Sequence, residues 1–208
     1  MADDRSRAPQ ARTRLARRAV LDAARTLFLE RGYGATTIDG ISVASEIPQA
    51  TVYRLFSSKK GILKALLDTS IAGDDEPVPV ATRSHVRSLF EATRPKDTLA
   101  RLAAVSVDIN TRTAPIYRIL VSAASSDTDA AAILDELTRQ RQHCQGRVAT
   151  ALARAKALRP GLRARGAGDV IHALASPELY HLLVVDRAWS PQRYERWLAE
   201  ALAAQLLP

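Results

Sequence analysis

Residues 37–59 decide the fold of this chain, and they read TIDGISVASEIPQATVYRLFSSK. Thr37 is a typical N-cap residue for a short helix over 38–45, whose apolar positions recur at helical spacing. A tight connection follows, and Pro48 suits the first turn of a second helix because its missing N–H has no intrahelical partner there. That second helix extends to Phe56. Two short helices joined by a turn of about three or four residues predict a helix-turn-helix.

The second helix has the two faces that a recognition helix needs. A helix that enters the major groove of DNA, about 12 Å wide, must present small or polar side chains at its start. Val52, Leu55 and Phe56 are free to face a core. The positions expected to face outward are Gln49, Ala50, Thr51, Tyr53 and Arg54.

The net charge of +8 is concentrated near the N-terminus. Residues 1–64 contain 12 of the 30 Lys and Arg residues and 6 of the 22 Asp and Glu residues, which gives them a net charge of +6. The remaining residues carry a net charge of +2. A local basic excess indicates a polyanionic partner, nucleic acid before an anionic membrane surface, although basic termini are often only solvated tails.

Helical periodicity continues beyond this stretch, and no segment alternates as a strand does. We therefore expect an all-α fold, with an N-terminal three-helix helix-turn-helix domain followed by a larger antiparallel helical bundle. Residues 1–11 are expected to be disordered. The run Gly73–Pro79 breaks the periodicity and predicts a boundary between domains 1–72 and 73–208. Further helices are expected from Ala16 to Gly32, after Ser57 or Ser58, at 83–92, 97–110, 115–124 and 128–157, at 166–186 with an interruption at Pro177, and at 191–206.

Several classes of protein are excluded by what the sequence lacks. No apolar run approaches the ~18 residues of a membrane span, and no secretory signal is visible. Cys144 is the only cysteine, which excludes an intrachain disulfide and fits a reducing cytoplasm. Neighbours on a helix diverge by ~100°, so His143 and Cys144 are poorly placed to chelate one metal ion. The sequence also shows no nucleophile elbow, glycine-rich phosphate loop or paired-His motif, and we expect no enzymatic activity, metal or cofactor.

The segment from Ala16 to Leu67 resembles the DNA-binding domain of TetR/AcrR-type transcriptional regulators. The order and spacing of several short pieces carry the resemblance, which is close over about the first third of the chain. These pieces are Gly32-Tyr33-Gly34-Ala35-Thr36-Thr37-Ile38, Ile41, Thr51-Val52-Tyr53-Arg54-Leu55-Phe56 and Ser58-Lys59.

The resemblance implies a set of contacts with double-stranded DNA. Gln49 and Thr51 would meet base edges, while Arg54 would read guanine or grip the backbone. Ala50 would be a small outward-facing residue beside them. Phosphate or minor-groove contacts would come from Thr37, Tyr53, Lys59, Lys60, Arg12 and Arg14. Two positions depart from the family pattern, because Glu46 stands where glycine is usual and Pro48 where a serine cap is usual.

The resemblance also implies a homodimer whose C-terminal bundle holds an unknown small-molecule effector. The dimer interface would use the last two long helices, although the same apolar residues could pack within one chain. Its expected residues are Leu179, Leu182, Leu183, Trp197, Leu198, Ala201 and Leu202. Polar residues on apolar stripes are the candidates for a pocket inside the bundle. These are Ser106, Asn110, Tyr117, Arg141, His143, Cys144, His172, Ser176 and Tyr180.

A cytoplasmic repressor that leaves a palindromic operator when it binds its effector is the function we expect. The alternatives are an all-α enzyme or ligand-binding protein whose basic head is incidental, and an architectural protein that binds DNA without sequence preference. An architectural protein would spread its basic residues over its surface, whereas here the basic excess is concentrated in residues 1–64, the basic head.

Overall fold

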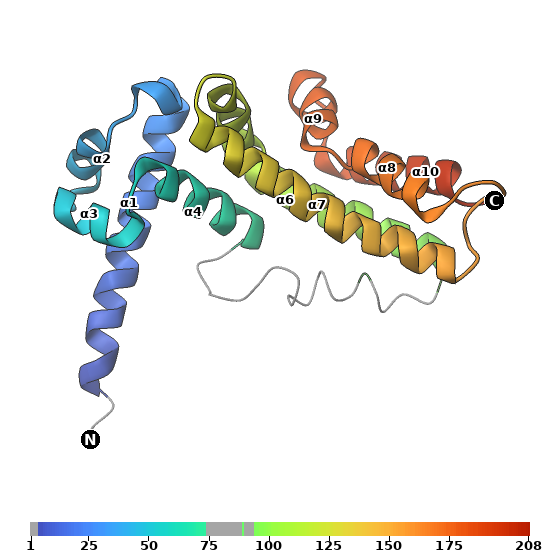
Figure 1. Cartoon of the computed structure of the whole chain (residues 1–208), viewed down its shortest axis with the longest axis horizontal. Helices are drawn as coiled ribbons and strands as arrows, with labels where there is room; N and C mark the ends of the chain where they lie inside the picture. Colours follow the sequence, from blue (N-terminus) through green and yellow to red (C-terminus); the bar gives the residue numbers. More distant parts are fainter. Residues whose placement is uncertain (1–3, 74–88, 90–93) are drawn as a thin grey trace. The chain divides into compact units, whose positions relative to one another are not determined.

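The structure is a computed structural model, and it describes residues 4–73, residue 89 and residues 94–208 (Figure 1). Within these ranges every regular element is a helix, which confirms the all-α prediction. The elements in chain order are α1 (Asp4–Ala35), α2 (Ile38–Ser45), α3 (Gln49–Phe56), α4 (Lys59–Ala72), α6 (Pro95–Ala124), α7 (Thr128–Arg154), α8 (Ala164–Leu174), α9 (Pro177–Tyr180), the π-helix η3 (His181–Asp186) and α10 (Pro191–Leu206).

The chain forms two compact units. Unit 1 contains Met1–Thr69 and Pro115–Leu134, and unit 2 contains Ser70–Ala114 and Asp135–Pro208. Helices α6 and α7 therefore contribute residues to both units. The boundary between residues 72 and 73 stays a prediction.

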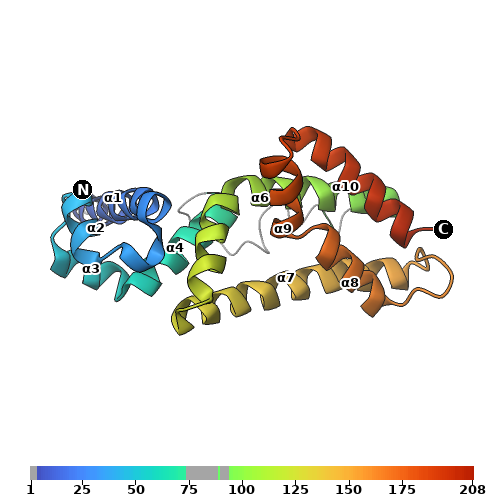
Figure 2. The ribbon, with the colours of Figure 1, turned by 90° about the horizontal axis from the view of Figure 1, so that it is seen from above.

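Unit 1 is built on the apolar stripe of α1. Val20, Ala24 and Phe28 on this helix are fully buried, and α2 and α3 pack against it in both ribbon views (Figures 1 and 2). The helix is interrupted at Gly32, whose φ of 78° and ψ of 167° are not helical. Glycine populates positive φ without a Cβ penalty, so the predicted end of the first helix falls where the backbone turns. The buried hydroxyl of Thr36 closes the turn by donating to the Leu27 carbonyl at 3.2 Å and to the Gly32 carbonyl at 2.9 Å.

The helix-turn-helix has the bounds that the sequence predicts for it. Thr37 caps α2, because its Oγ1 accepts the Gly40 N–H at 3.0 Å. Glu46 then turns the chain in the left-handed region, with a φ of 57°. Pro48 precedes α3 and provides no side-chain cap. At the start of α4, Ser58 accepts the Gly61 N–H at 3.1 Å, so Ser58 rather than Ser57 caps this helix.

Unit 2 has its own apolar core. Helices α7 and α8 approach closely, since a Cβ built at Gly168 would lie 3.9 Å from the Ala149 Cβ (Figure 2). Tyr194 on α10 is fully buried, and its hydroxyl donates to the Leu174 carbonyl at 3.1 Å. Its ring meets Tyr180 edge-on at 5.3 Å, and α10 is thereby fixed to α8 and α9.

The structure corrects the predicted ends of three helices. The chain is already helical from Asp4, because its N-terminus is rich in Ala and Arg, which are strong helix formers. The segments 97–110 and 115–124 form one helix, α6, which contains Pro115. Pro115 costs α6 one backbone hydrogen bond but does not end it. The expected helix 83–92 lies outside the described residues, apart from Leu89.

The segment 166–186 is also divided differently. Helix α8 ends at Leu174, and Pro177 starts α9 instead of interrupting one long helix. Ser176 caps α9 by accepting the Leu179 N–H at 3.1 Å. A proline at the first helical position loses no intrahelical bond, so the Ser-Pro pair begins a helix here as it does at α10.

Candidate nucleic-acid interface

Helix α3 divides its side chains into two faces. Val52 and Phe56 point into the core and are 1% and 6% exposed. Thr51 is half-buried. The exposed positions are Gln49, Ala50, Tyr53 and Arg54. The outer face thus offers an amide, a phenol and a guanidinium, which donate and accept hydrogen bonds at base edges and phosphates.

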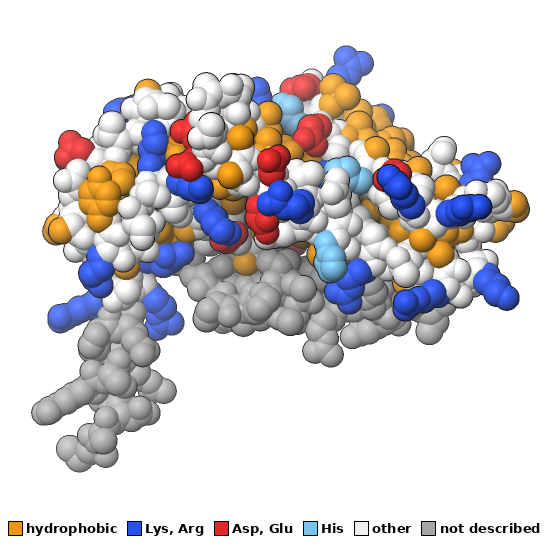
Figure 3. Space-filling view, in the orientation of Figure 1, with side chains coloured by type: hydrophobic (Ala, Val, Ile, Leu, Met, Phe, Trp, Pro, Cys, Tyr) orange, Lys and Arg blue, Asp and Glu red, His pale blue; other side chains and the backbone are white. Residues whose placement is uncertain are grey.

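An apolar side chain of α2 adds to this exposed surface. Val43 is 73% exposed, more than Tyr53 at 48%. Apolar side chains lie at the surface over α2 and α3, with Lys and Arg side chains below them (Figure 3). Val43 was missed in the sequence, although it lies about 200° around the helix from the buried Ile41, which was a readable signal.

Lys59 is held inside unit 1 by groups of the α1–α2 connection. Its Nζ donates to the carbonyl of Tyr33 at 2.8 Å and to that of Thr36 at 3.0 Å. It also lies 4.2 Å from the centre of the Tyr33 ring, a cation–π contact. Burial lowers the pKa of Lys59, while the charge of Asp127 acts in the opposite direction. Two of the three ammonium N–H donors of Lys59 are thus used within the chain, and one is left for a phosphate.

Tyr33 shares this environment. Burial, followed by the charges of Asp127 and Asp129, raises the pKa of its phenol to about 12. Lys60, the neighbour of Lys59, is engaged differently: its Nζ forms an ion pair with Asp129 at 2.8 Å. Both partners are substantially exposed, so the pair contributes little to stability.

The basic residues of α1 lie on a helix and not on an extended arm. Helix α1 begins at Asp4, which corrects the expectation of disorder up to residue 11, and Arg12 and Arg14 are exposed on it. Arg17 turns toward the core and stacks over the Phe56 ring, with its Cζ 4.7 Å from the ring centre. Arg17 thus covers the end of α3, whereas Arg12 and Arg14 are available to phosphate.

Buried polar groups of unit 2 include several of the expected pocket residues. Tyr180 is 3% exposed, and its hydroxyl lies 2.8 Å from the Thr111 hydroxyl. His172 contacts Arg141 and Gln145. Asn110 is buried, and Ser106 and Ser176 are half-buried. Tyr117 is also buried, but it belongs to unit 1. Cys144 is exposed, which corrects its placement inside the bundle: it lies on the outer side of α7.

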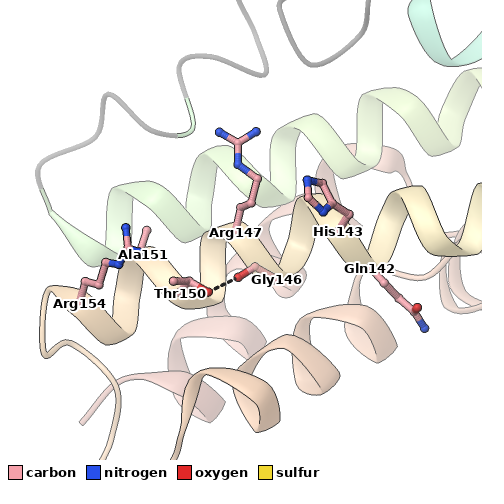
Figure 4. Close-up of a pocket in the computed structure, with 7 residues that line it drawn as sticks. All are labelled: Gln142, His143, Gly146, Arg147, Thr150, Ala151 and Arg154. Carbon is pink, nitrogen blue, oxygen red and sulfur yellow. Dashed lines mark hydrogen bonds between the residues drawn. The ribbon is translucent and has the colours of Figure 1, made fainter.

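A hollow lies along α7 (Figure 4). It has a volume of about 530 Å³ and is open to solvent. Its lining residues are Gln142, His143, Gly146, Arg147, Thr150, Ala151 and Arg154. Of the expected pocket residues, only His143 lines it. The predicted pocket within the bundle stays a prediction.

Two of the residues expected at a dimer interface belong to the core instead. Leu198 and Leu202 of α10 are fully buried within the chain and cannot contact a second copy. The apolar stripe of α10 packs on its own unit, which apolar spacing alone cannot distinguish from an interface. Leu182 is 50% exposed, and its neighbour Val185, which was missed, is 51% exposed. Leu179, Leu183, Trp197 and Ala201 are half-buried.

The described residues contain neither a metal-binding cluster nor a membrane-spanning helix. In this part of the chain, no three His, Cys, Asp or Glu side chains come together as a metal ion would require. None of the helices described is both long and apolar enough to cross a lipid bilayer.

The fold and the exposed face of α3 define a helix-turn-helix protein with a second, all-helical region. Residues 20–66 match the family described as bacterial regulatory proteins, tetR family. The helix-turn-helix domain of this chain is thus similar to that of the tetR family. This match agrees with the resemblance drawn from the sequence.

Individual relatives support the same assignment. An HTH-type transcriptional repressor of Mycobacterium tuberculosis is 40% identical over 100 residues, which cover 44% of this chain and 53% of that protein. YvkB of Bacillus subtilis, described as an uncharacterized HTH-type transcriptional regulator, is 42% identical over 48 residues, or 23% of this chain and 25% of YvkB. This chain thus spans between a quarter and about half of the length of the curated relatives it matches. These relatives are regulators, in agreement with the prediction that the chain is not an enzyme.

The fold of the whole chain has solved counterparts. The native structure of NalD, the secondary repressor of the MexAB-OprM multidrug efflux pump in Pseudomonas aeruginosa, aligns with a TM-score of 0.71. It covers 94% of this chain and 98% of NalD, at 20% sequence identity. At this identity the likeness shows the fold alone.

Proposed function

We propose that this chain is a cytoplasmic, homodimeric transcriptional repressor that binds a palindromic DNA operator and releases it when a small-molecule effector binds. The observation that carries the proposal is the outer face of α3, where Gln49, Tyr53 and Arg54 are exposed on a helix held in the core by Val52 and Phe56. The match of residues 20–66 to the tetR family supports the same function.

The proposed DNA contacts fall into two kinds. Gln49, Thr51 and Arg54 lie on the helix that enters the major groove and would contact base edges. The other contacts would be with the DNA backbone, which positions the protein without reading sequence. Their residues are Thr37, Tyr53, Lys59, Lys60, Arg12 and Arg14, and Lys59 would use its third ammonium donor. Ala50 would be a small outward-facing residue at the start of α3.

Selection of bound sequences from a random duplex pool, followed by gel-shift titration, tests this function. We expect a palindromic consensus bound at least about 10³-fold tighter than random DNA at the same salt concentration. In Arg54→Ala, the loss of a base contact should cost about 1–3 kcal/mol of binding free energy and relax the consensus at one position of each half-site. Arg163→Ala is the matched control and should leave DNA binding unchanged. Arg163 is an exposed arginine at the N-cap of α8, and its side chain makes no capping hydrogen bond. Equal affinity for all duplexes would instead indicate an architectural protein.

A dimer is required because two recognition helices must reach successive major grooves, about 34–36 Å apart. The exposed apolar side chains of Leu182 and Val185 on η3 are the proposed centre of the interface, with Trp197 at its edge. Light scattering should give twice the chain mass of 22.6 kDa. The double substitution Leu182→Glu and Val185→Glu should give the monomer mass, whereas Leu15→Glu, at a 69% exposed position of α1, should leave the dimer intact. A wild-type monomer would refute the half-site argument.

A further inference from the structure

A polar cluster interrupts the apolar contact between α7 and α8 in unit 2. Val148 and Ala149 on α7 and Ile171 on α8 belong to one buried cluster. Gln145, one turn before these residues on α7, and His172, the residue after Ile171 on α8, are polar, and Gln145 is only 7% exposed. Arg141 lies one further turn along α7 and reaches the same imidazole. Since buried polar groups are tolerated only with partners, the hydrogen bonds here can be assigned one by one.

The contacts of His172 suit a neutral imidazole. Nη2 of Arg141 lies 3.3 Å from its Nε2 and 3.5 Å from its Nδ1, and a guanidinium nitrogen can only donate. In the tautomer with the proton on Nδ1, this atom donates to Oε1 of Gln145 at 2.8 Å and Nε2 accepts from Arg141. Burial, and then the charge of Arg141, lower the pKa of His172, while the charges of Glu178 and Asp169 act in the opposite direction. His172 is thus a neutral acceptor and supplies no negative charge to the guanidinium.

Arg141 is left without a close counter-ion. Its Nε is buried and has no hydrogen-bond partner. The Arg141 side chain is 20% exposed, and its Nη1 lies 4.0 Å from the Glu178 carboxylate, which is itself 61% exposed. That distance is too long for a hydrogen bond. A guanidinium presents parallel N–H groups that match the two oxygens of a carboxylate, and the arrangement here leaves such donors unused.

The imbalance between donors and acceptors extends beyond Arg141. Among the described residues, the buried side-chain nitrogen and oxygen atoms without a partner are Nε of Arg141, Nδ2 of Asn110 and Nδ1 of His181. All three belong to unit 2. The first two can only donate, and none is an oxygen. A molecule that satisfies this unit must bring acceptors.

We propose that the effector of this protein carries a carboxylate, and that Arg141 binds it, with His172 and Gln145 holding the guanidinium in place. The remainder of such a molecule is apolar, because the side chains that adjoin the cluster on α7 and α8 are aliphatic. The proposal rests on the proposed function, since it names the chemistry of the effector in that function.

Three probes with the same alkyl chain distinguish the contribution of the carboxylate to binding from that of the apolar chain. Octanoate, octanol and octylamine are titrated into the full-length chain without DNA, and the Nε–H signals of arginine are followed by NMR. Octanoate should bind at least about tenfold tighter than octanol, because charge-assisted hydrogen bonds are gained only with the acid. It should also shift the Nε–H signal that is absent from Arg141→Met.

The variants assign the effect to one side chain. Arg141→Met should remove the preference for octanoate. Arg141→Lys keeps the charge but not the paired donors, and should retain part of the preference even if the methionine variant does not fold. Arg139→Met, at an exposed arginine paired with Glu136 on the same helix, should keep all of it. Octanoate binding no tighter than octanol, or an unchanged preference in Arg141→Met, overturns the proposal.

The same protein is then tested for operator binding by gel shift. If octanoate binds through Arg141 but no duplex is preferred, the proposed function fails and the carboxylate site stands. If a duplex is preferred but octanoate is not, only the carboxylate site fails. Release of the operator by octanoate from the wild type and not from Arg141→Met supports both.

Discussion

The left-handed residue in the turn between α2 and α3 allows a sharp test of how this turn is built. Glu46 has a φ of 57° and a ψ of 22°, and its N–H donates to the Val43 carbonyl at 3.3 Å. A residue with a Cβ costs about 1–2 kcal/mol in this conformation, whereas glycine does not. Glycine also makes the unfolded chain more flexible, which costs about 0.4–1 kcal/mol. Glu46→Gly should therefore stabilise the head by about 0.5–1 kcal/mol.

Native-state hydrogen exchange measures this change where it occurs. Amides of α2 and α3 that exchange by opening of the head should be protected about 2–5-fold more in Glu46→Gly than in the wild type. Glu46→Ala is the control, because it removes the carboxylate and keeps the Cβ; it should show no comparable gain. Equal protection in the two variants would mean that the charge of Glu46, and not its backbone, sets the stability of the turn. That result would refute the strain argument.

Three further substitutions probe other parts of the chain. Gly61→Ala should destabilise by about 1–3 kcal/mol although alanine favours helices, because a Cβ here would collide with the Phe56 carbonyl; unfolding by urea measures the loss, and a gain in stability would contradict the steric reading. Lys59→Met should cost about 1–3 kcal/mol by leaving two carbonyls unpaired, against less than about 1 kcal/mol for Lys60→Met; thermal unfolding would contradict this if the two losses were equal. Since the folded chain lowers the pKa of His172, stability from this group is full above its ordinary value of 6.5 and falls as pH drops below it. His172→Gln should therefore lose less stability than the wild type between pH 7.5 and 5.5, and an identical pH dependence would exclude this group.

The helix-turn-helix was predictable because its signals are local. The cap at Thr37, the tight turn at Glu46 and the proline before α3 each act within a few residues of the positions that they shape. The buried positions of α3 followed from helical spacing alone. Such features depend on short-range sterics and hydrogen bonds, which the sequence contains in full.

The features that depended on distant partners were not predictable. Lys59 bonds carbonyls 23 and 26 residues away, and nothing in its neighbourhood distinguishes that use from a phosphate contact. Likewise, the spacing of Leu198 and Leu202 along the sequence is the same whether the apolar face of α10 packs on its own unit or on a second chain. Helix α6 continues through Pro115 because the energetic cost of one lost bond is smaller than what its packing contributes, a balance that periodicity does not reveal.

The link from Lys59 to Tyr33 has a consequence for any attempt to isolate the DNA-binding head. A fragment that ends with α3 would contain every residue proposed to read bases, yet it would lack Lys59, which holds the α1–α2 connection. It would also lack Ile62 and Leu63 of α4, which are fully buried in the structure. An autonomous head therefore extends at least through α4, and a graft of the recognition surface onto another scaffold must bring Lys59 with it.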